Sequence, residues 1–178
     1  KAYDACNGSF EITDIRTSSS ARRPQAPFIT STLQQEASTK LGFSAKRTMS
    51  IAQRLYEGID LGNGQEGLIT YMRTDSTRLS DVFMDQAKDL IEQKYGKKYL
   101  GKTYHAKNDE GAQDAHEAIR PTTLDHDPEM IKGSLTNEQY RLYKLIYARA
   151  LASQMAPSTS DSLVVILSRN GYDLAANG

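Results

Sequence analysis

Strand-like patterns stand at both ends of this chain, and a long block with helical spacing lies between them. Near the start, Phe10 and Ile12 alternate with polar residues. Near the end, Ser162–Ser168 is rich in strand-forming residues, and the Asn170-Gly171 pair that follows is typical of a type I′ hairpin turn. Because an isolated strand leaves its backbone groups unsatisfied, the two ends are expected to join one sheet. The pattern predicts an α+β, mainly helical fold, with a helical domain inserted into a strand-rich one.

Two short helices are predicted in the first part of the helical block. The first has its N-cap at Ser31 or Thr32 and ends at Gly42. The second is capped by Ser44 and ends at Gly58. Its buried face is expected to contain four residues at helical spacing, namely Ala45, Met49, Ala52 and Tyr56.

Two further helices are predicted later in the block. Ser80 caps the third, which ends at Gly96 and should bury Phe83, Ala87 and Ile91. The fourth begins with a capping box formed by Thr136 and Gln139. Its core side is expected to contain Tyr140, Tyr143, Tyr147, Ala150 and Leu151. Residues 17–26, rich in Ser, Arg and Pro, are predicted to form a linker.

Composition excludes several classes of protein. The chain has 22 basic and 22 acidic residues, so net charge does not indicate a nucleic-acid partner, although the first third is basic. Cys6 is the single cysteine, which excludes an internal disulfide and a cysteine-rich zinc site. No apolar run approaches a membrane span, and Lys1–Phe10 lacks the apolar core of a signal peptide. Because the chain does not begin with Met, we expect it to be part of a longer protein.

The segment Gly67–Ser80 carries the most chemistry. If it is extended, Tyr71, Arg73 and Asp75 share one face. A tyrosine phenol titrates near pH 10 and needs a positive neighbour to act as a phenolate nucleophile. An arginine supplies that fixed charge together with a donor fork that suits phosphate. On these three residues alone, a packing role for Tyr71 is the simpler interpretation, since most tyrosines pack.

Two motifs resemble those of type IA DNA topoisomerases. Gly67–Ser80 resembles their active-site segment, in which the tyrosine of Thr-Tyr-x-Arg-Thr-Asp-Ser is the nucleophile. Downstream, Asp114–Thr122 (Asp-Ala-His-Glu-Ala-Ile-Arg-Pro-Thr) resembles a second motif of the family. The resemblance extends over about residues 27–155, and Met72 after the tyrosine is typical of the bacterial topoisomerase I branch.

The resemblance implies an activity. Tyr71 would attack a phosphodiester of single-stranded DNA and form a 5′-phosphotyrosine intermediate. Strand passage and religation would then relax negatively supercoiled DNA without ATP. Arg73 would bind the scissile phosphate and stabilise charge in the transition state, and Asp75 would position Arg73.

The second motif contributes three supporting residues. His116 is expected to act at the scissile phosphate, either by contact or by proton transfer. Glu117 is expected to orient or charge His116. Two roles stay open for Arg120, which can hold phosphate or pair with Glu117.

The resemblance also implies a cofactor and partners. Mg²⁺ is expected in the full-length enzyme, with its ligands in a Toprim domain outside this chain, so the isolated fragment should be inactive. Asp125–Glu129 fits Asp-x-Asp-x-Glu, but it follows no apolar strand and lies downstream of the tyrosine, so a loop is predicted and no metal site. The implied partners are single-stranded and negatively supercoiled DNA and the remaining domains of the same chain. The resemblance implies a cytoplasmic, nucleoid-associated bacterial monomer with no membrane contact.

The predicted domain division follows from these assignments. Residues 1–27 would be a piece of a strand-rich arch domain and a linker, and 28–133 the helical domain that holds Tyr71. Residues 134–178 would be a helix and strands that return to the arch. The rival interpretation is a non-catalytic DNA- or protein-binding helical module in which Tyr71 is structural. Tyr71→Phe separates the two, because only covalent capture of DNA requires the hydroxyl.

Overall fold

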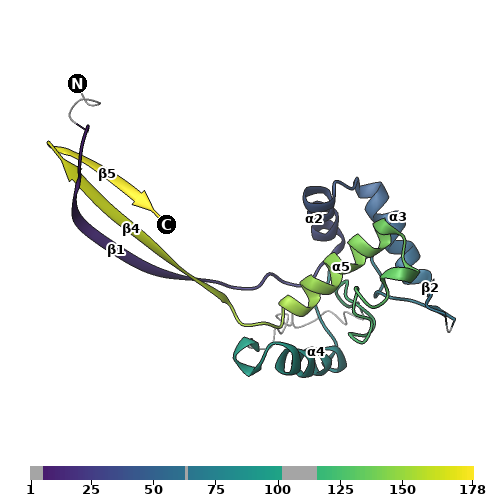
Figure 1. The fold of residues 1–178 in the computed structure, drawn as a ribbon. Coiled ribbons are helices and arrows are strands. Elements are labelled where there is room, and N and C mark those ends of the chain that lie inside the picture. Colours follow the sequence, from purple (N-terminus) through teal and green to yellow (C-terminus); the bar gives the residue numbers. More distant parts are fainter. Residues whose placement is uncertain (1–5, 63, 102–115) are drawn as a thin grey trace. The chain divides into compact units, whose positions relative to one another are not determined.

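The computed structural model describes residues 6–62, 64–101 and 116–178 (Figure 1). The chain forms two compact units. One combines Lys1–Arg23 with Pro157–Gly178, and the other is Pro24–Ala156. Four α-helices and a three-stranded sheet occur in the described residues, in agreement with the predicted mixed fold class.

The first unit is an antiparallel sheet in the order β1-β4-β5 (Figure 1). Its strands are β1 (Glu11–Arg22), β4 (Ser158–Arg169) and β5 (Tyr172–Asn177). Asn170 and Gly171 join β4 to β5 with φ of 48° and 77°. Two positive φ values in succession are what a type I′ turn requires, so the predicted hairpin is confirmed.

The predicted linker at residues 17–26 is wrong over most of its length. Strand β1 continues to Arg22, and its serine-rich half pairs with the start of β4. The Oγ atoms of Ser18 and Ser162 lie 3.0 Å apart, and those of Ser20 and Ser160 lie 3.3 Å apart. Small hydroxyl side chains that bond across the two strands stabilise this exposed ribbon, a pairing that composition does not indicate.

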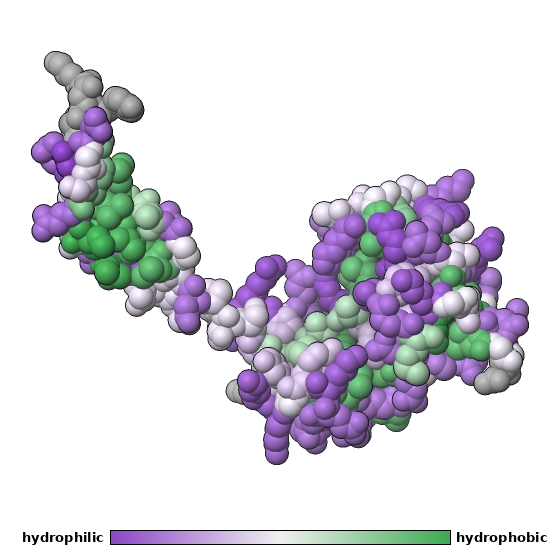
Figure 2. Space-filling model, in the orientation of Figure 1, coloured by the Kyte–Doolittle hydropathy of each residue, from purple (hydrophilic) through white to green (hydrophobic). Residues whose placement is uncertain are grey.

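One face of this sheet is apolar. The register places Ile12 opposite Leu167 and Ile15 opposite Val165, and residues directly opposite point to the same side. Ile12 and Ile15 are each 58% exposed. Figure 2 shows the apolar side chains gathered over these strands.

The second unit contains all four helices and a short hairpin. The helices are α2 (Thr30–Leu41), α3 (Ala45–Glu57), α4 (Asp81–Lys94) and α5 (Asn137–Ala152). The hairpin pairs β2 (Ile59–Asp60) with β3 (Gln65–Glu66), and two 3₁₀ turns occupy Lys97–Tyr99 and Lys132–Ser134. Helix α5 packs against α2 and α3 and therefore belongs to this unit.

The predictions for α4 and α5 are confirmed in most respects. Ser80 caps α4 by accepting from the N–H of Phe83, and the predicted side chains of α4 are buried. Thr136 and Gln139 form the predicted capping box of α5. The aromatic stripe of α5 is core except at Tyr140, which is half-buried and donates to Glu129 at 2.6 Å.

The details of α2 and α3 differ from the prediction. Helix α2 begins at Thr30 with Ile29 as N-cap, so the predicted N-cap at Ser31 or Thr32 is wrong. Thr32 is instead the third residue of the helix, and its hydroxyl accepts from the Ile29 N–H at 3.0 Å. The end of α2 at Gly42, with φ of 72°, is confirmed. The buried face of α3 consists of Thr48, Ile51, Ala52 and Leu55. Of the predicted face only Ala52 is buried, whereas Ala45 and Tyr56 are exposed and Met49 is half-buried, since Ile51 and Leu55 occupy the core.

Stability of the helical unit should fall at alkaline pH because two buried phenols must stay neutral. Burial raises the pKa of Tyr143, and it raises the pKa of Tyr147 from 10.0 to about 12. Below pH 10 both phenols are neutral in the folded and the unfolded chain. Above it the unfolded chain loses protons first, so the free energy of unfolding should drop by about 1.4 kcal/mol per pH unit for each phenol.

Urea unfolding at several pH values between about 9 and 11 measures this slope. Tyr143→Phe removes one of the two titrating phenols. The free energy of unfolding of this variant should therefore fall less steeply with pH, by the contribution of one phenol. A decline with the same slope in this variant would show that other groups cause it.

Candidate functional site

The segment Gly67–Ser80 contains no regular strand or helix, and its backbone pairs with another segment at one bridge. Ile69 forms an isolated bridge with Pro121. On either side, the Thr70 N–H donates to the Arg120 carbonyl at 2.9 Å, and the Thr122 N–H donates to the Leu68 carbonyl at 3.0 Å. The pairing does not extend further, because the Leu68 N–H donates to the Leu55 carbonyl at 2.7 Å and the Arg120 N–H donates to the Thr70 hydroxyl at 3.0 Å.

The two sequence motifs lie side by side. Ile119 of the second motif bridges to Phe28 on one side. On the other, the Ala118 N–H donates to the Arg78 carbonyl at 2.8 Å, and the Thr70 hydroxyl donates to the Ala118 carbonyl at 2.6 Å. The second motif is therefore fixed against the segment that carries Tyr71.

Thr30, the first residue of α2, fixes the backbone after the tyrosine. Its N–H donates to the Thr74 carbonyl at 2.9 Å, and its hydroxyl lies 2.8 Å from the Met72 carbonyl. The same hydroxyl accepts from the Thr74 N–H at 2.9 Å. These contacts place Arg73 beside the start of α2. The sequence offers no signal for this role of Thr30, because its partners are distant in the chain.

Burial alternates along this segment. Tyr71, Arg73 and Asp75 are exposed, whereas Met72 is fully buried and Thr74 is half-buried. Buried Met72 anchors the segment in the core, and the polar side chains remain accessible to a ligand. This alternation agrees with the predicted common face.

An open groove of about 480 Å³ lies at the N-terminus of α2. Arg73, Asp75 and His116 line it together with residues of the first turn of α2. That turn contains no acidic residue, and the N–H groups at a helix start have no partner within the helix. The groove thus combines a guanidinium, an imidazole and a helix N-terminus, all of which favour a phosphate, with the carboxylate of Asp75.

Arg120 and Glu117 are paired with each other. The Arg120 Nε donates to Glu117 at 2.8 Å, and its other nitrogens donate to the Pro121 carbonyl at 2.8 Å and the Ser80 hydroxyl at 3.1 Å. The guanidinium also lies 4.9 Å from the centre of the Phe83 ring. Of the two roles left open for Arg120, the structure contains the pairing with Glu117. Within the described residues, Glu117 forms no hydrogen bond or ion pair with His116.

The acidic stretch Asp125–Glu129 is the predicted loop. A hydrogen bond from the Glu129 N–H and the nearby Lys94 ammonium hold the pKa of Asp127 below its ordinary value. Glu129 accepts from Lys144 and Tyr140, which lowers its pKa as well. In the described parts of the chain, no group of three or more His, Cys, Asp or Glu residues is arranged to hold a metal ion.

Tyr56 is a site neighbour that sequence reasoning assigned to the core. Its ring lies edge-to-face against the ring of Tyr71, with 5.3 Å between centroids and 63° between planes. The helical periodicity of α3 contained a usable signal. Ile51 and Leu55 are apolar and four positions apart, so they lie on the same face of the helix. The next residue, Tyr56, is therefore turned away from the core.

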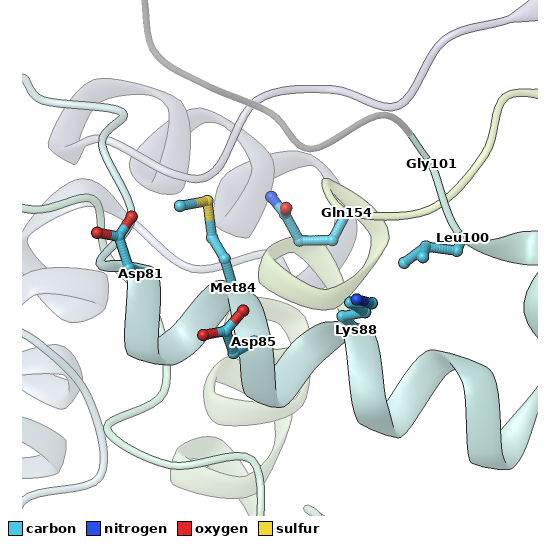
Figure 3. A pocket seen from close by; sticks show the side chains of 7 residues that line it. All are labelled: Asp81, Met84, Asp85, Lys88, Leu100, Gly101 and Gln154. Atoms are coloured by element: carbon cyan, nitrogen blue, oxygen red, sulfur yellow. The ribbon is translucent and has the colours of Figure 1, made fainter.

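A second, smaller cavity of about 280 Å³ lies along α4 (Figure 3). Its wall includes the carboxylates of Asp81 and Asp85, the ammonium of Lys88 and the amide of Gln154. None of the predicted site residues that the structure describes lines this cavity.

In the same described residues, no helix has the length and apolarity to span a membrane.

Replacing Gly67 by Ala should destabilise the site. A Cβ at this position would lie 2.6 Å from the carbonyl oxygen of Tyr56, and a backbone atom cannot rotate away. We expect a loss of about 1–3 kcal/mol in the free energy of unfolding, measured by urea denaturation. Gly133→Ala is the matched control, because its Cβ would meet nothing within 4 Å. Equal effects of the two substitutions would contradict the close approach.

Comparison with known proteins identifies the family. A sequence model of the DNA topoisomerase family matches residues 1–178. The fold is similar to the full-length topoisomerase I from Thermotoga maritima in a monoclinic crystal form, with a TM-score of 0.83 and 40% sequence identity. The match covers 99% of this chain and 28% of that one, so the chain spans little more than a quarter of that structure. Since the family match covers every residue, this chain belongs to the DNA topoisomerase family, a family of isomerases.

Proposed function

We propose that this chain is the part of a bacterial, type IA topoisomerase I that carries the catalytic tyrosine. The phenol oxygen of Tyr71 attacks a phosphorus atom of single-stranded DNA, and the bond from phosphorus to the 3′ oxygen breaks. The phenol proton is lost, the 3′ oxygen gains a proton, and the 5′ phosphate stays on Tyr71 as a phosphodiester. Attack by the 3′ hydroxyl reverses these changes, and no ATP is consumed because one phosphodiester replaces another.

The groove at the start of α2 is the observation that carries this proposal. Arg73 and His116 come from two separate motifs and line the same groove. Arg73 stands two residues after Tyr71 in the chain, and Tyr71 is exposed. Among the described residues, Arg73 forms no ion pair with a carboxylate, so its guanidinium is available to a phosphate. A cation and helix dipole aimed at one phosphate would stabilise the charge that develops in the transition state.

The other groove residues have supporting roles in this proposal. His116 contacts the phosphate or transfers a proton to or from it. Asp75 limits the directions that the Arg73 guanidinium can take. Glu117 and Arg120 act structurally, because their charges satisfy each other and hold the second motif against α4.

The proposed Mg²⁺ site lies outside this chain. In the described residues, no group of three or more His, Cys, Asp or Glu is placed to hold a metal ion. We propose that its ligands belong to a Toprim domain elsewhere in the full-length protein. The proposed substrate is negatively supercoiled DNA, bound at a single-stranded region by a monomer, and the isolated chain should not relax it.

A denaturing trap on the full-length protein tests the proposal. The protein is incubated with a 3′-labelled single-stranded oligonucleotide and Mg²⁺ and then quenched with detergent. A 5′-phosphotyrosine enzyme should leave the label attached to protein, and peptide mapping should place it on Tyr71. Absence of an adduct in a protein that still binds the oligonucleotide would overturn the proposal and favour a binding module.

A further inference from the structure

The Tyr56–Tyr71 ring pair lies at the surface of the helical unit. Tyr56 is 41% exposed and Tyr71 is 43% exposed, yet the two rings meet edge-to-face with their centroids 5.3 Å apart. Neither ring belongs to the buried core of the unit. Contact between two partly exposed rings needs a cause other than core packing.

Backbone contacts fix the end of α3, which carries Tyr56, against the segment that carries Tyr71. Tyr56 lies in the last turn of α3, which ends at Gly58. The Leu68 N–H donates to the Leu55 carbonyl at 2.7 Å, one residue from Tyr56. Gly67 approaches the Tyr56 carbonyl so closely that a side chain would collide with it. The end of α3 therefore contacts the start of Gly67–Ser80, a few residues before Tyr71.

A partly exposed tyrosine on an extended segment can adopt several χ1 rotamers. An edge-to-face partner on a fixed helix favours one of them, and such pairs stabilise beyond the area that they bury. Attack on phosphorus needs the phenol oxygen within about 3–3.5 Å of its target and in line with the leaving oxygen. Restricting the ring before DNA binds would raise the fraction of productive encounters.

We propose that Tyr56 is a positioning residue that holds the Tyr71 ring in the orientation used for attack. The inference rests on the proposed function of Tyr71 and adds the residue that orders it. The Tyr56 ring performs this role, and its hydroxyl is not required. In the part of the chain that the structure describes, the Tyr56 hydroxyl forms no hydrogen bond.

Cleavage kinetics of Tyr56 variants in the full-length protein provide the test. Single-turnover cleavage of the labelled oligonucleotide is measured at saturating protein, and its Kd is measured separately. Tyr56→Leu should slow cleavage about three- to tenfold, the range expected for one aromatic pair, and leave Kd within about twofold. Tyr56→Phe keeps the ring and should cleave within about twofold of the unsubstituted protein.

Controls separate the possible outcomes. Tyr99→Leu removes a ring that is 44% exposed on another segment and should leave cleavage unchanged. Tyr56→Met serves as a second truncation if Tyr56→Leu lowers the melting temperature. The inference is overturned if Tyr56→Leu cleaves at the original rate, if Tyr56→Phe is as slow as Tyr56→Leu, or if Kd alone weakens.

Failure of the proposed function would look different. In that case the unsubstituted protein forms no adduct, or the adduct persists in Tyr71→Phe, and both proposals fall. A normal Tyr71 adduct together with normal cleavage by Tyr56→Leu would remove only the positioning role.

Discussion

Tyr71→Phe in the full-length protein should abolish the covalent protein–DNA adduct and lower relaxation of supercoiled DNA by about 10³-fold or more. The hydroxyl is the proposed nucleophile, and loss of a nucleophile commonly costs at least this much because no other group takes its place. The ring is retained, so its contact with Tyr56 and the fold should be unchanged. Oligonucleotide Kd should stay within about twofold. Adduct formation, relaxation and binding are measured on the same preparation.

Tyr95→Phe is the matched control for this substitution. Tyr95 is 43% exposed, as is Tyr71, but it follows α4 and lies outside both sequence motifs. Its variant should form the adduct and relax DNA normally. If Tyr71→Phe still forms an adduct, another side chain is the nucleophile and the proposed mechanism is wrong.

Arg120→Met should lower the free energy of unfolding by about 3 kcal/mol. The Arg120 and Glu117 side chains are 12% and 20% exposed, so the substitution leaves a largely buried carboxylate without its cation. Breaking such a pair from one side typically costs about 3–5 kcal/mol. The bond from Arg120 to Ser80 at the start of α4 is lost as well. Urea denaturation followed by circular dichroism measures the change.

Two further variants show whether Arg120 acts through the fold or through DNA. Glu117→Gln combined with Arg120→Met removes the unpaired charge and should recover about 1–2 kcal/mol relative to Arg120→Met alone. Arg73→Met, at an exposed position in the groove, should change stability by less than about 0.5 kcal/mol but should slow cleavage. A stable Arg120→Met variant that binds DNA poorly would instead assign Arg120 to phosphate binding.

Features set by neighbouring residues could be predicted from sequence. Ser80, the Thr136–Gln139 capping box and the Asn170-Gly171 turn each specify backbone geometry within a few residues, and all three occur as expected. The buried stripe of α4 follows from helical periodicity in the same way. The alternation of exposed and buried residues after Tyr71 needs only an extended backbone.

Features that depend on partners distant in the chain could not be predicted from sequence. The serine ribbon of β1 is a strand only because β4 presents matching hydroxyls more than a hundred residues later. The start of α2 shifts because Thr30 bonds to the backbone at Met72 and Thr74. Tyr56 leaves the predicted core face because Leu55 and Ile51 occupy it, and this places its ring on Tyr71.

The sequence by itself determined the family resemblance, most of the helix ends and the residues that can perform phosphate chemistry, because these properties belong to residue types at short spacing. Only the tertiary structure decided which of those residues meet. It brings Arg73 and His116 to one groove and commits Arg120 to Glu117. The physical reason is that hydrogen bonds and ion pairs act over a few ångströms in space. The separation of their partners along the chain carries no information about that distance until the helices and extended segments have packed.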